Sequence, residues 1–208
     1  MSGKFIVFEG LDGSGKTTQI NLLAKRLKDS GRNVIVTAEP TASLSGSILR
    51  DVLSGASVRN DYELATLFAW DRVYHNTDPV NGLSKLLSAG NTVICDRYYY
   101  SSIAYQGPTT DFEWVKSMNV DCPAIRKPDL CIFLDLSASE SMERIMKNRS
   151  SIEIFEKEES LRNIREAFKK TFSMLDDNVV VIDASGSVEE VAERINTAVS
   201  EYFSRDND

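Results

Sequence analysis

The first twenty residues constrain the fold of this chain more than any other stretch. An apolar run over residues 4–8, rich in β-branched and aromatic side chains, leads into a glycine-rich loop. The loop opens into a segment whose apolar residues recur at helical spacing, namely Ile20, Leu22, Leu23 and Leu27. This order predicts a strand, a loop and an amphipathic helix.

The loop has the spacing G-x-x-x-x-G-K-[ST] of a phosphate-binding loop, at Gly10, Gly15, Lys16 and Thr17. Glycines let successive backbone N–H groups turn inward around a polyphosphate without clashes from Cβ atoms. Lys16 would reach the outer phosphates, the Thr17 hydroxyl would bind Mg²⁺, and the positive end of the helix would face the anion. A chance glycine turn would not need this strand before it and this helix after it, so we predict nucleotide binding.

Four further apolar runs have the composition of strands, and helical stretches separate them: residues 34–38, 92–96, 130–135 and 179–183. Because these runs are continuously apolar rather than alternating, they indicate a parallel sheet buried on both faces. The 208 residues contain no linker, repeat or low-complexity tract. We therefore predict an α/β fold in a single domain over residues 1–208. Its five-stranded parallel sheet would be flanked by helices on both faces, with ligands beyond the carboxyl ends of the strands.

Three helical segments lie between and after these strands. Residues 61–89 are helical in pattern, with a break expected at Asp78-Pro79. Residues 153–175 form an amphipathic helix, and Ser187 with Glu190 predicts a capping box for a last helix that ends near Phe203. The first segment has more apolar residues than one stripe needs, which indicates either a subunit interface or burial in the core.

The composition of the chain argues against some classes of binding partner. The net charge is −7, from 24 basic and 31 acidic residues, so no general attraction to nucleic acid or to an anionic membrane is expected. Every apolar run is strand-sized, and we expect no membrane segment and no export signal. Cys95, Cys122 and Cys131 show no C-x-x-C spacing, which is typical of reduced thiols in a cytoplasmic protein. The only histidine, His75, has no partner for a metal site or a catalytic relay, so we expect it on a helix surface.

The phosphate-binding loop does not identify the group that receives the phosphate. The N-K-x-D motif by which switch GTPases read guanine does not occur in the sequence, and the third strand instead ends in Asp96-Arg97-Tyr98. The Asp96 carboxylate is placed to hold Mg²⁺ directly or through water. Arg97 offers a planar fork that suits a phosphate monoester.

With these motifs the chain resembles the thymidylate kinases, the P-loop kinase family that phosphorylates dTMP with ATP. The resemblance covers nearly the whole chain through residues 8–19, 39–40, 68–72, 96–107 and 182–186. The loop is common to many families, whereas Asp96-Arg97-Tyr98 followed by Ser101, Ala104, Tyr105 and Gln106 is far more specific. The resemblance implies a P-loop kinase fold, a homodimer, and binding of ATP and Mg²⁺. The ATP site that it implies consists of Gly10, Asp12, Gly13, Ser14, Gly15, Lys16, Thr17, Thr18, Arg144 and Ser185.

The resemblance also implies a site for the base and sugar of the acceptor. Phe68 is similar to the aromatic residue that stacks on thymine, and Arg72, one helical turn later, to the arginine that donates to a pyrimidine carbonyl. Tyr105 would crowd the sugar 2′ position and disfavour ribonucleotides. Ser101 and Gln106 fall where the family lines the base pocket.

On the phosphate side, Arg97 resembles the residue that grips the dTMP phosphate, together with Arg50. Asp12 would accept a hydrogen bond from the sugar 3′-hydroxyl, and Glu39 belongs to the same implied site. Taken singly, each of these acceptor-site residues has a plain alternative as a core, packing or surface residue. Their joint occurrence at the family's spacing favours the site.

Residues 142–156 correspond to the lid over ATP in this family. Arg144 is placed to stack on adenine, and Arg149 to reach the transferring phosphoryl group. Three positions depart from the usual pattern. Ile154 stands in place of a lid arginine, Gly13 stands where one branch carries its catalytic arginine, and Ala38 stands where bacterial members often have arginine. Charge stabilisation is therefore assigned to the remaining cations, Lys16, Arg97, Mg²⁺ and Arg149, with Lys147 as the alternative lid cation.

Because the acceptor is itself a phosphate oxyanion, the reaction needs alignment and charge neutralisation rather than a general base. The predicted reaction is ATP + dTMP giving ADP + dTDP, in the synthesis of dTTP. One alternative is a kinase for another deoxynucleotide or for a nucleoside. A P-loop ATPase switch would hydrolyse ATP without an acceptor, and it would leave Phe68, Arg72 and Tyr105 without a shared purpose.

Overall fold

The computed structural model describes residues 3–147 and 154–205, and the side chains of residues 147, 154–157 and 205 lie outside this description. Strands and helices alternate along the chain, as predicted. The elements are β1 (Phe5–Gly10), α1 (Lys16–Asp29), β2 (Val34–Ala38), α2 (Leu44–Leu53), α3 (Asp61–Thr77), α4 (Leu83–Ser88), β3 (Thr92–Asp96), α5 (Tyr99–Gln106), the 3₁₀ turn η1 (Gly107–Thr109), α6 (Phe112–Val120), β4 (Leu130–Asp135), α7 (Ala138–Lys147), α8 (Ile154–Met174), β5 (Val179–Asp183) and α9 (Val188–Arg205).

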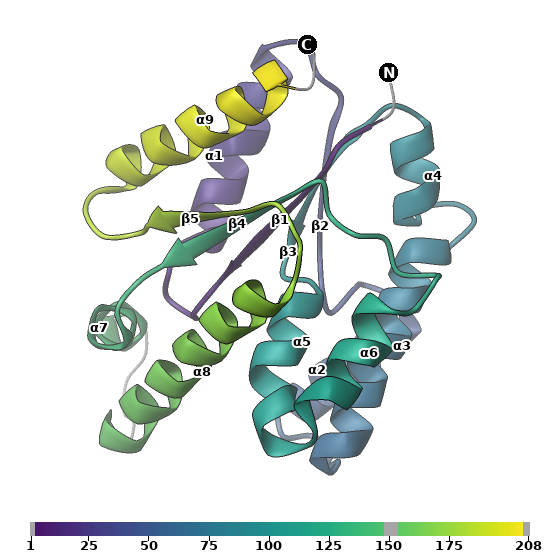
Figure 1. Cartoon of the computed structure of the whole chain (residues 1–208), viewed down its shortest axis with the longest axis vertical. Helices are drawn as coiled ribbons and strands as arrows, with labels where there is room; N and C mark the ends of the chain where they lie inside the picture. Colours follow the sequence, from purple (N-terminus) through teal and green to yellow (C-terminus); the bar gives the residue numbers. More distant parts are fainter. Residues whose placement is uncertain (1–2, 148–153, 206–208) are drawn as a thin grey trace.

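The five strands form one parallel sheet in the order β2-β3-β1-β4-β5 (Figure 1). β1 is central, with Val7 beside Cys95 of β3 on one side and beside Cys131 of β4 on the other. All residues of β1 are buried, as expected for a continuous apolar run covered on both faces. The predicted sheet is therefore confirmed. The strand order reverses at β1, so a ligand crevice is expected at the carboxyl end of that strand.

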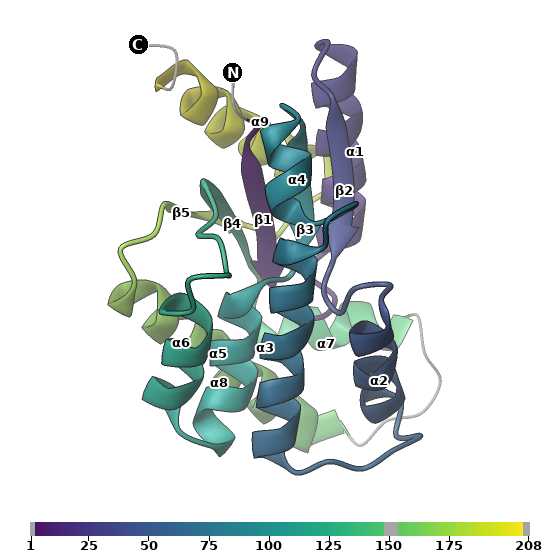
Figure 2. The same ribbon diagram turned by 90° about the vertical axis from the view of Figure 1, so that its right-hand side faces the viewer.

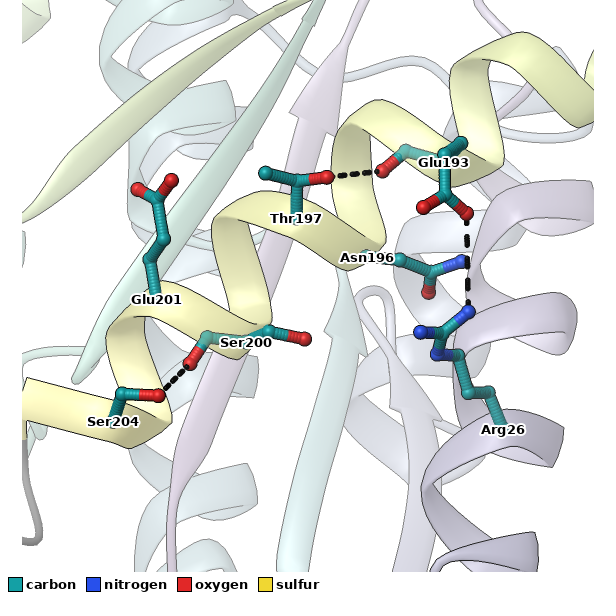
Figure 3. Close-up of a pocket in the computed structure, with 7 residues that line it drawn as sticks. All are labelled: Arg26, Glu193, Asn196, Thr197, Ser200, Glu201 and Ser204. Carbon is teal, nitrogen blue, oxygen red and sulfur yellow. Dashed lines mark hydrogen bonds and ion pairs between the residues drawn. The ribbon is translucent and has the colours of Figure 1, made fainter.

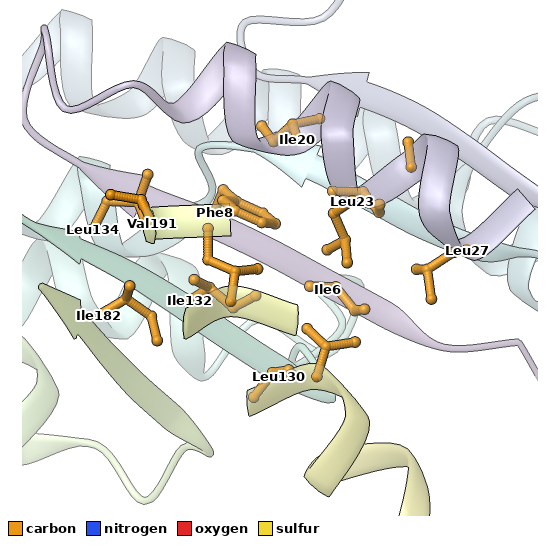
Figure 4. Packing of buried hydrophobic residues seen from close by; sticks show 14 of the residues in the cluster. Ile6, Phe8, Ile20, Leu23, Leu27, Leu130, Ile132, Leu134, Ile182 and Val191 are labelled. Carbon is orange, nitrogen blue, oxygen red and sulfur yellow. The ribbon is translucent and has the colours of Figure 1, made fainter. Parts of the chain in front are cut away.

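Helices cover both faces of the sheet (Figures 1 and 2). α1 and α9 lie side by side on one face, and α3, α5 and α8 lie on the other. Figure 4 shows the core beneath α1 and α9, where aliphatic side chains of the helices meet those of the strands. The opposite core is rich in aromatic rings, namely Phe5, Tyr98, Tyr99, Tyr100, Phe133 and Phe168.

The buried stripe of α1 differs from the prediction at one residue. Ile20, Leu23, Ala24 and Leu27 are buried, whereas Leu22 is 41% exposed. Positions i, i+3, i+4 and i+7 share one face of a helix, and position i+2 points to the opposite side. Leu22 is therefore not part of the core.

The long helical segment is divided where Asp78-Pro79 predicted the break, into α3 and α4. The predicted capping box of α9 is present: the Glu190 N–H donates to Ser187 Oγ at 3.2 Å, and the Ser187 N–H donates to Glu190 Oε2 at 2.8 Å. Within residues 3–147 and 154–205, every helix is too short or too polar to cross a bilayer.

Candidate active site

The loop between β1 and α1 is built around left-handed glycines. Gly13 and Gly15 have φ of 80° and 92°, a region where a side chain would be strained. Gly15 is also the residue before the first turn of α1, and no side chain caps that helix. The first N–H groups of α1 are thus available to an anion, as the sequence motif predicts.

Lys16, the first residue of α1, folds back over this loop. Its Nζ donates to the carbonyl oxygens of Gly10 at 3.1 Å and Leu11 at 3.0 Å. Burial, and after it the nearby charge of Arg97, lower the pKa of Lys16 to about 8. The ammonium group is held at the mouth of the loop by contacts that a phosphate would replace.

Asp96 and Thr17 meet at the carboxyl end of the central strands. Asp96 pairs with Phe8 in the sheet, and the Thr17 hydroxyl donates to Asp96 Oδ2 at 3.4 Å. Asp96 Oδ1 is buried and has no hydrogen-bond partner among the described residues. A buried carboxylate oxygen left unpaired beside a hydroxyl is a donor set that suits Mg²⁺, so the residues present fit this ion.

Arg97 joins the residues that the resemblance assigned to the acceptor. Its Nη2 donates to Asp12 Oδ1 at 2.6 Å, its Nη1 donates to Ser101 Oγ at 2.9 Å, and its guanidinium lies 5.3 Å from the centre of the Tyr105 ring. Its backbone φ is 67°, the only positive value of a non-glycine residue in the described chain. This strain turns the side chain toward the loop and is typical of a functional position.

Glu9 holds this strained turn, and sequence reasoning missed it. Its buried carboxylate accepts from the N–H groups of Tyr98 at 2.8 Å and Ser101 at 3.1 Å, and from Ser101 Oγ at 2.6 Å. Burial raises the pKa of Glu9 above its ordinary value. The signal in the sequence was an acidic residue inside an apolar strand, where a charge needs buried partners.

A cavity of about 370 Å³ lies beside Arg97. Besides Asp12 and Arg97, its lining includes six predicted acceptor residues, namely Glu39, Phe68, Arg72, Ser101, Tyr105 and Gln106. Pro40, Leu53, Tyr98 and Ser102 complete the lining. The Tyr105 hydroxyl and Gln106 Oε1 are buried without a hydrogen-bond partner in the described structure. Unpaired polar atoms beside an aromatic ring and an arginine suit a small polar ring as ligand.

Arg72 is held by several partners at this cavity. It is 1% exposed, its Nε donates to Glu39 Oε2 at 2.8 Å, and its Nη2 donates to Ser102 Oγ at 3.1 Å. Its Nη1 donates to Asn119 Oδ1. The alternative of a solvated helix arginine is therefore excluded.

His75 corrects the sequence-based expectation of a surface histidine. It is 5% exposed, and its two ring nitrogens lie 2.9 Å from Glu39 Oε1 and 3.0 Å from Thr37 Oγ1. The prediction failed because both partners come from β2 and the residue after it, which are distant in sequence from α3. A single histidine without a nearby motif gave no signal of them.

Asp71 is a further buried residue whose role the sequence did not indicate. Its carboxylate accepts from the Thr41 N–H at 2.8 Å, from the Thr41 hydroxyl at 2.6 Å, and from the Ser45 hydroxyl at 2.6 Å. These bonds tie the start of α2 to α3. Leu53 of α2 lines the smaller cavity, so Asp71 helps to position one of its walls.

A larger cleft of about 1000 Å³ follows the phosphate-binding loop toward α7 and the start of α9. It is lined by Asp12, Gly13, Ser14, Gly15, Lys16, Thr17 and Thr18, and by Asp96 and Arg144. Arg144 donates from Nη2 to the Ala184 carbonyl at 3.0 Å. The two cavities share Asp12, Glu39, Pro40 and Arg97, so they meet at the tip of the loop.

Among the described residues, three predicted site residues line neither cavity: Gly10, Arg50 and Ser185. Arg50 is exposed and donates to the Thr41 carbonyl. Ser185 lies beside the larger cleft but not in its lining, and its hydroxyl donates to Asp183 Oδ1 at 2.7 Å. Arg149 lies outside the described residues, as do the side chains of Lys147 and Ile154.

α7 packs directly on the loop at Gly13. A Cβ atom on Gly13 would lie 2.8 Å from the Ser141 carbonyl oxygen and 3.1 Å from Ile145 Cγ1. The Ser141 hydroxyl donates to the Asp12 carbonyl. An arginine at position 13 has no room in this arrangement, which explains why glycine stands there.

A third cavity, of about 470 Å³, lies between α1 and α9 (Figure 3). Its lining is polar and includes Arg26, Glu193 and Ser200. It contains none of the predicted site residues, so the candidate active site is the pair of joined cavities.

Comparison with known proteins agrees with this geometry. The family model described as thymidylate kinase matches residues 8–195. A protein of Pyrococcus horikoshii named "Probable thymidylate kinase" is 40% identical over 199 residues, which cover 92% of this chain and 93% of that protein. One of Methanococcus aeolicus with the same name is 40% identical, with coverage of 92% and 93%. The "Probable thymidylate kinase 1" of Saccharolobus solfataricus is 41% identical, with coverage of 92% and 94%.

Proposed function

The chain belongs to the thymidylate kinase family, and from that premise we propose that the protein transfers a phosphoryl group from ATP to dTMP, giving ADP and dTDP. One observation carries the proposal beyond the family: a phosphate-binding cleft and a second cavity meet at Asp12 and Arg97. An ATPase needs only the first cavity. A transferase between two nucleotides needs both, so hydrolysis without an acceptor is not favoured.

On the donor side, the ATP phosphates lie along the loop from Gly10 to Thr18, and Arg144 lies against the adenine. The geometry that supports this is the uncapped N-terminus of α1 and the position of Arg144 in the larger cleft. Thr17 and Asp96 would hold Mg²⁺, which when bound neutralises charge on the β- and γ-phosphates.

On the acceptor side, Phe68 stacks on the base, Arg72 donates to a pyrimidine carbonyl, and Tyr105 lies against the sugar. Arg97 binds the acceptor phosphate through the fork that now contacts Asp12 and Ser101. Asp12 accepts a hydrogen bond from the sugar 3′-hydroxyl in this arrangement. The ion pair between Arg97 and Asp12 supports this exchange of partners, because it already holds both side chains in position.

The chemical step needs no general base, since the acceptor oxygen is already anionic. Lys16 neutralises charge as it moves from the γ-phosphate toward ADP, and Arg97 neutralises the acceptor side. A further cation is proposed to come from a lid over residues 142–156, with Arg149 as the first choice and Lys147 as the second. Closing such a lid would exclude water, which otherwise competes with dTMP.

A panel of acceptors tests the proposal by ADP release in a coupled assay. We expect dTMP to be preferred over dUMP, dGMP and unphosphorylated deoxynucleosides. Arg97→Ala should lower dTMP turnover by about 10³-fold or more and change ATP binding little, because Arg97 contacts the acceptor. A preference for unphosphorylated nucleosides, or full activity of the variant, would refute the acceptor assignment.

We also propose a cytoplasmic homodimer formed by one domain per chain. Support for the compartment comes from Cys95, Cys122 and Cys131, which are all free thiols. Support for the dimer comes from exposed aromatic side chains on α3, among them Trp70 at 48% and Tyr74 at 44% exposure. Neither residue lines the cavities described above.

A further inference from the structure

His75 and Arg72 lie one helical turn apart on α3 and face the same buried carboxylate. His75 Nδ1 lies 2.9 Å from Glu39 Oε1, while Arg72 Nε and Nη2 lie 2.8 Å and 2.7 Å from Glu39 Oε2. Each oxygen of Glu39 therefore has its own partner. The side chains of the three residues are between 1% and 6% exposed, so water does not compete for these bonds.

The partners of the two ring nitrogens together indicate the tautomer of His75. His75 Nε2 lies 3.0 Å from the Thr37 hydroxyl, which is able to donate or accept. Glu39 is able only to accept when ionised, so Nδ1 must carry a proton and Nε2 accepts from Thr37 when the ring is neutral. Glu39 thus selects the tautomer, and the Thr37 hydroxyl near the end of β2 donates to the remaining ring nitrogen.

His75 itself reaches neither cavity in the described structure, whereas Glu39 and Arg72 line the smaller one. Arg72 donates hydrogen bonds from Nε to Glu39, from Nη1 to Asn119 and from Nη2 to Ser102, and Nη2 also forms an ion pair with Glu39 at 2.7 Å. One N–H on Nη1 remains for a ligand. The direction of this N–H depends on Glu39, because Glu39 holds both Nε and Nη2.

We propose that His75 is a positioning residue for the acceptor base: through Glu39 it holds the Arg72 guanidinium in the orientation that leaves an N–H for a pyrimidine carbonyl. This rests on the proposed function, in that the base is taken to bind in the smaller cavity. Without the imidazole donor, Glu39 Oε1 is an unpaired buried acceptor, and the carboxylate will turn to find another partner. Arg72 then loses a fixed orientation, and binding of the acceptor weakens.

The tautomer is tested directly in the wild-type protein by a long-range ¹H–¹⁵N correlation spectrum after ¹⁵N labelling of histidine. The chain has a single histidine, so only one imidazole gives signals. We expect a ring whose Nδ1 carries a proton, either neutral or doubly protonated. A neutral ring with its proton on Nε2 would overturn the proposal, since its Nδ1 has nothing to donate to Glu39.

The positioning role is tested by His75→Leu and His75→Asn. Leucine removes the donor, whereas the asparagine amide places an N–H near the position of Nδ1. We expect His75→Leu to raise the KM for dTMP about tenfold, with kcat and the KM for ATP nearly unchanged. The KM for dTMP of His75→Asn should lie close to that of the wild type. Equal losses in kcat and in both KM values, or no loss in the leucine variant, would contradict the role.

Val199→Ala is the control for lost stability. Val199 is 2% exposed in the core under α9, on the opposite face of the sheet. We expect a lower Tm and an unchanged KM for dTMP. If it raises that KM as much as His75→Leu does, general instability explains the effect and the proposal fails. A wild-type enzyme that does not consume dTMP refutes the proposed function instead, and the imidazole spectrum then still decides the contact with Glu39.

Discussion

Lys16 is a buried cation whose protonation sets how strongly the loop attracts phosphate. Burial and the charge of Arg97 lower its pKa to about 8, compared with about 10.4 for an unperturbed lysine. Below pH 8 the free enzyme therefore carries a charged Lys16, and above pH 8 it carries a neutral one. Phosphate groups stabilise the charged form, so a bound nucleotide raises the pKa again.

This linkage predicts that ADP binding takes up a proton near pH 8.5 and weakens as the pH rises from about 8 to about 9.5. The measurement is calorimetric titration in buffers of different ionisation enthalpy. Lys16→Arg should abolish the uptake, because a guanidinium stays charged over this range. A wild-type protein that binds ADP at pH 8.5 without proton uptake would show that Lys16 is already charged in the free enzyme.

Glu9 is a second residue whose role depends on buried contacts. Its carboxylate accepts from Ser101 Oγ, and that oxygen in turn accepts from Arg97 Nη1. In Glu9→Gln the amide N–H₂ would face the same hydroxyl, which would lose the acceptor for its own proton. We expect a loss of about 1–3 kcal/mol in the free energy of unfolding, measured by urea denaturation.

Glu193→Gln is the matched control for that change. Its side chain is 73% exposed on α9 and makes a long ion-pair contact of 3.9 Å with Arg26. We expect the free energy of unfolding of Glu193→Gln to lie within about 0.5 kcal/mol of the wild-type value. Equal effects in the two variants would mean that the Glu9 contacts add nothing to stability.

Sequence reasoning found residues that belong to a motif and missed those that support it. Lys16, Arg97 and Phe68 were predictable because their spacing carries the chemistry. Glu9 and His75 were not, because their roles depend on partners that only the fold brings near: Ser101 is 92 residues from Glu9, and Glu39 is 36 residues from His75. Burial of a polar side chain does not follow from local pattern alone.

At the scale of elements, the strands were the most predictable part of the molecule. A strand covered on both faces must be continuously apolar, and that signal needs no knowledge of its neighbours. α2 gave no such signal. Its start is held by Asp71 of α3, which bonds Thr41 and Ser45 across 30 and 26 residues, and its Leu44 and Leu53 are exposed.

The contact between α7 and the phosphate-binding loop gives a prediction at Gly13. Gly13→Ala combines a strained φ of 80° with a clash against the Ser141 carbonyl oxygen 2.8 Å away. We expect a loss of about 2–4 kcal/mol in the free energy of unfolding, together with weaker ADP binding, because α7 or the loop must shift. Urea denaturation and calorimetry measure the two effects.

Gly31→Ala separates strain from packing in that experiment. Gly31 has a similar φ of 86°, but an added Cβ would meet nothing within 4 Å. We expect Gly31→Ala to lower the free energy of unfolding by only about 1 kcal/mol and to leave ADP binding unchanged. If both variants lose the same stability, the contact with α7 does not constrain position 13.

At the scale of the whole molecule, α3 has two faces with different tasks. Arg72 and His75 point into the protein and support the acceptor cavity. Tyr62, Trp70 and Tyr74 are spaced by multiples of four residues and are 56%, 48% and 44% exposed. Residues at this spacing lie along one side of a helix, and we propose that a second copy of the chain contacts this aromatic stripe.

The proposed dimer therefore predicts that Trp70→Glu gives a monomer. A charged side chain in the centre of an apolar interface must lose its bound water on association. The free energy of this desolvation exceeds the binding free energy that a single aromatic contact contributes. Multi-angle light scattering at micromolar concentration should show twice the chain mass of 23.2 kDa for the wild type and a single chain mass for the variant. Leu22→Glu, on the exposed side of α1 across the sheet, should remain dimeric. A monomeric wild type would refute the dimer, and a monomeric Leu22→Glu would move the interface away from α3.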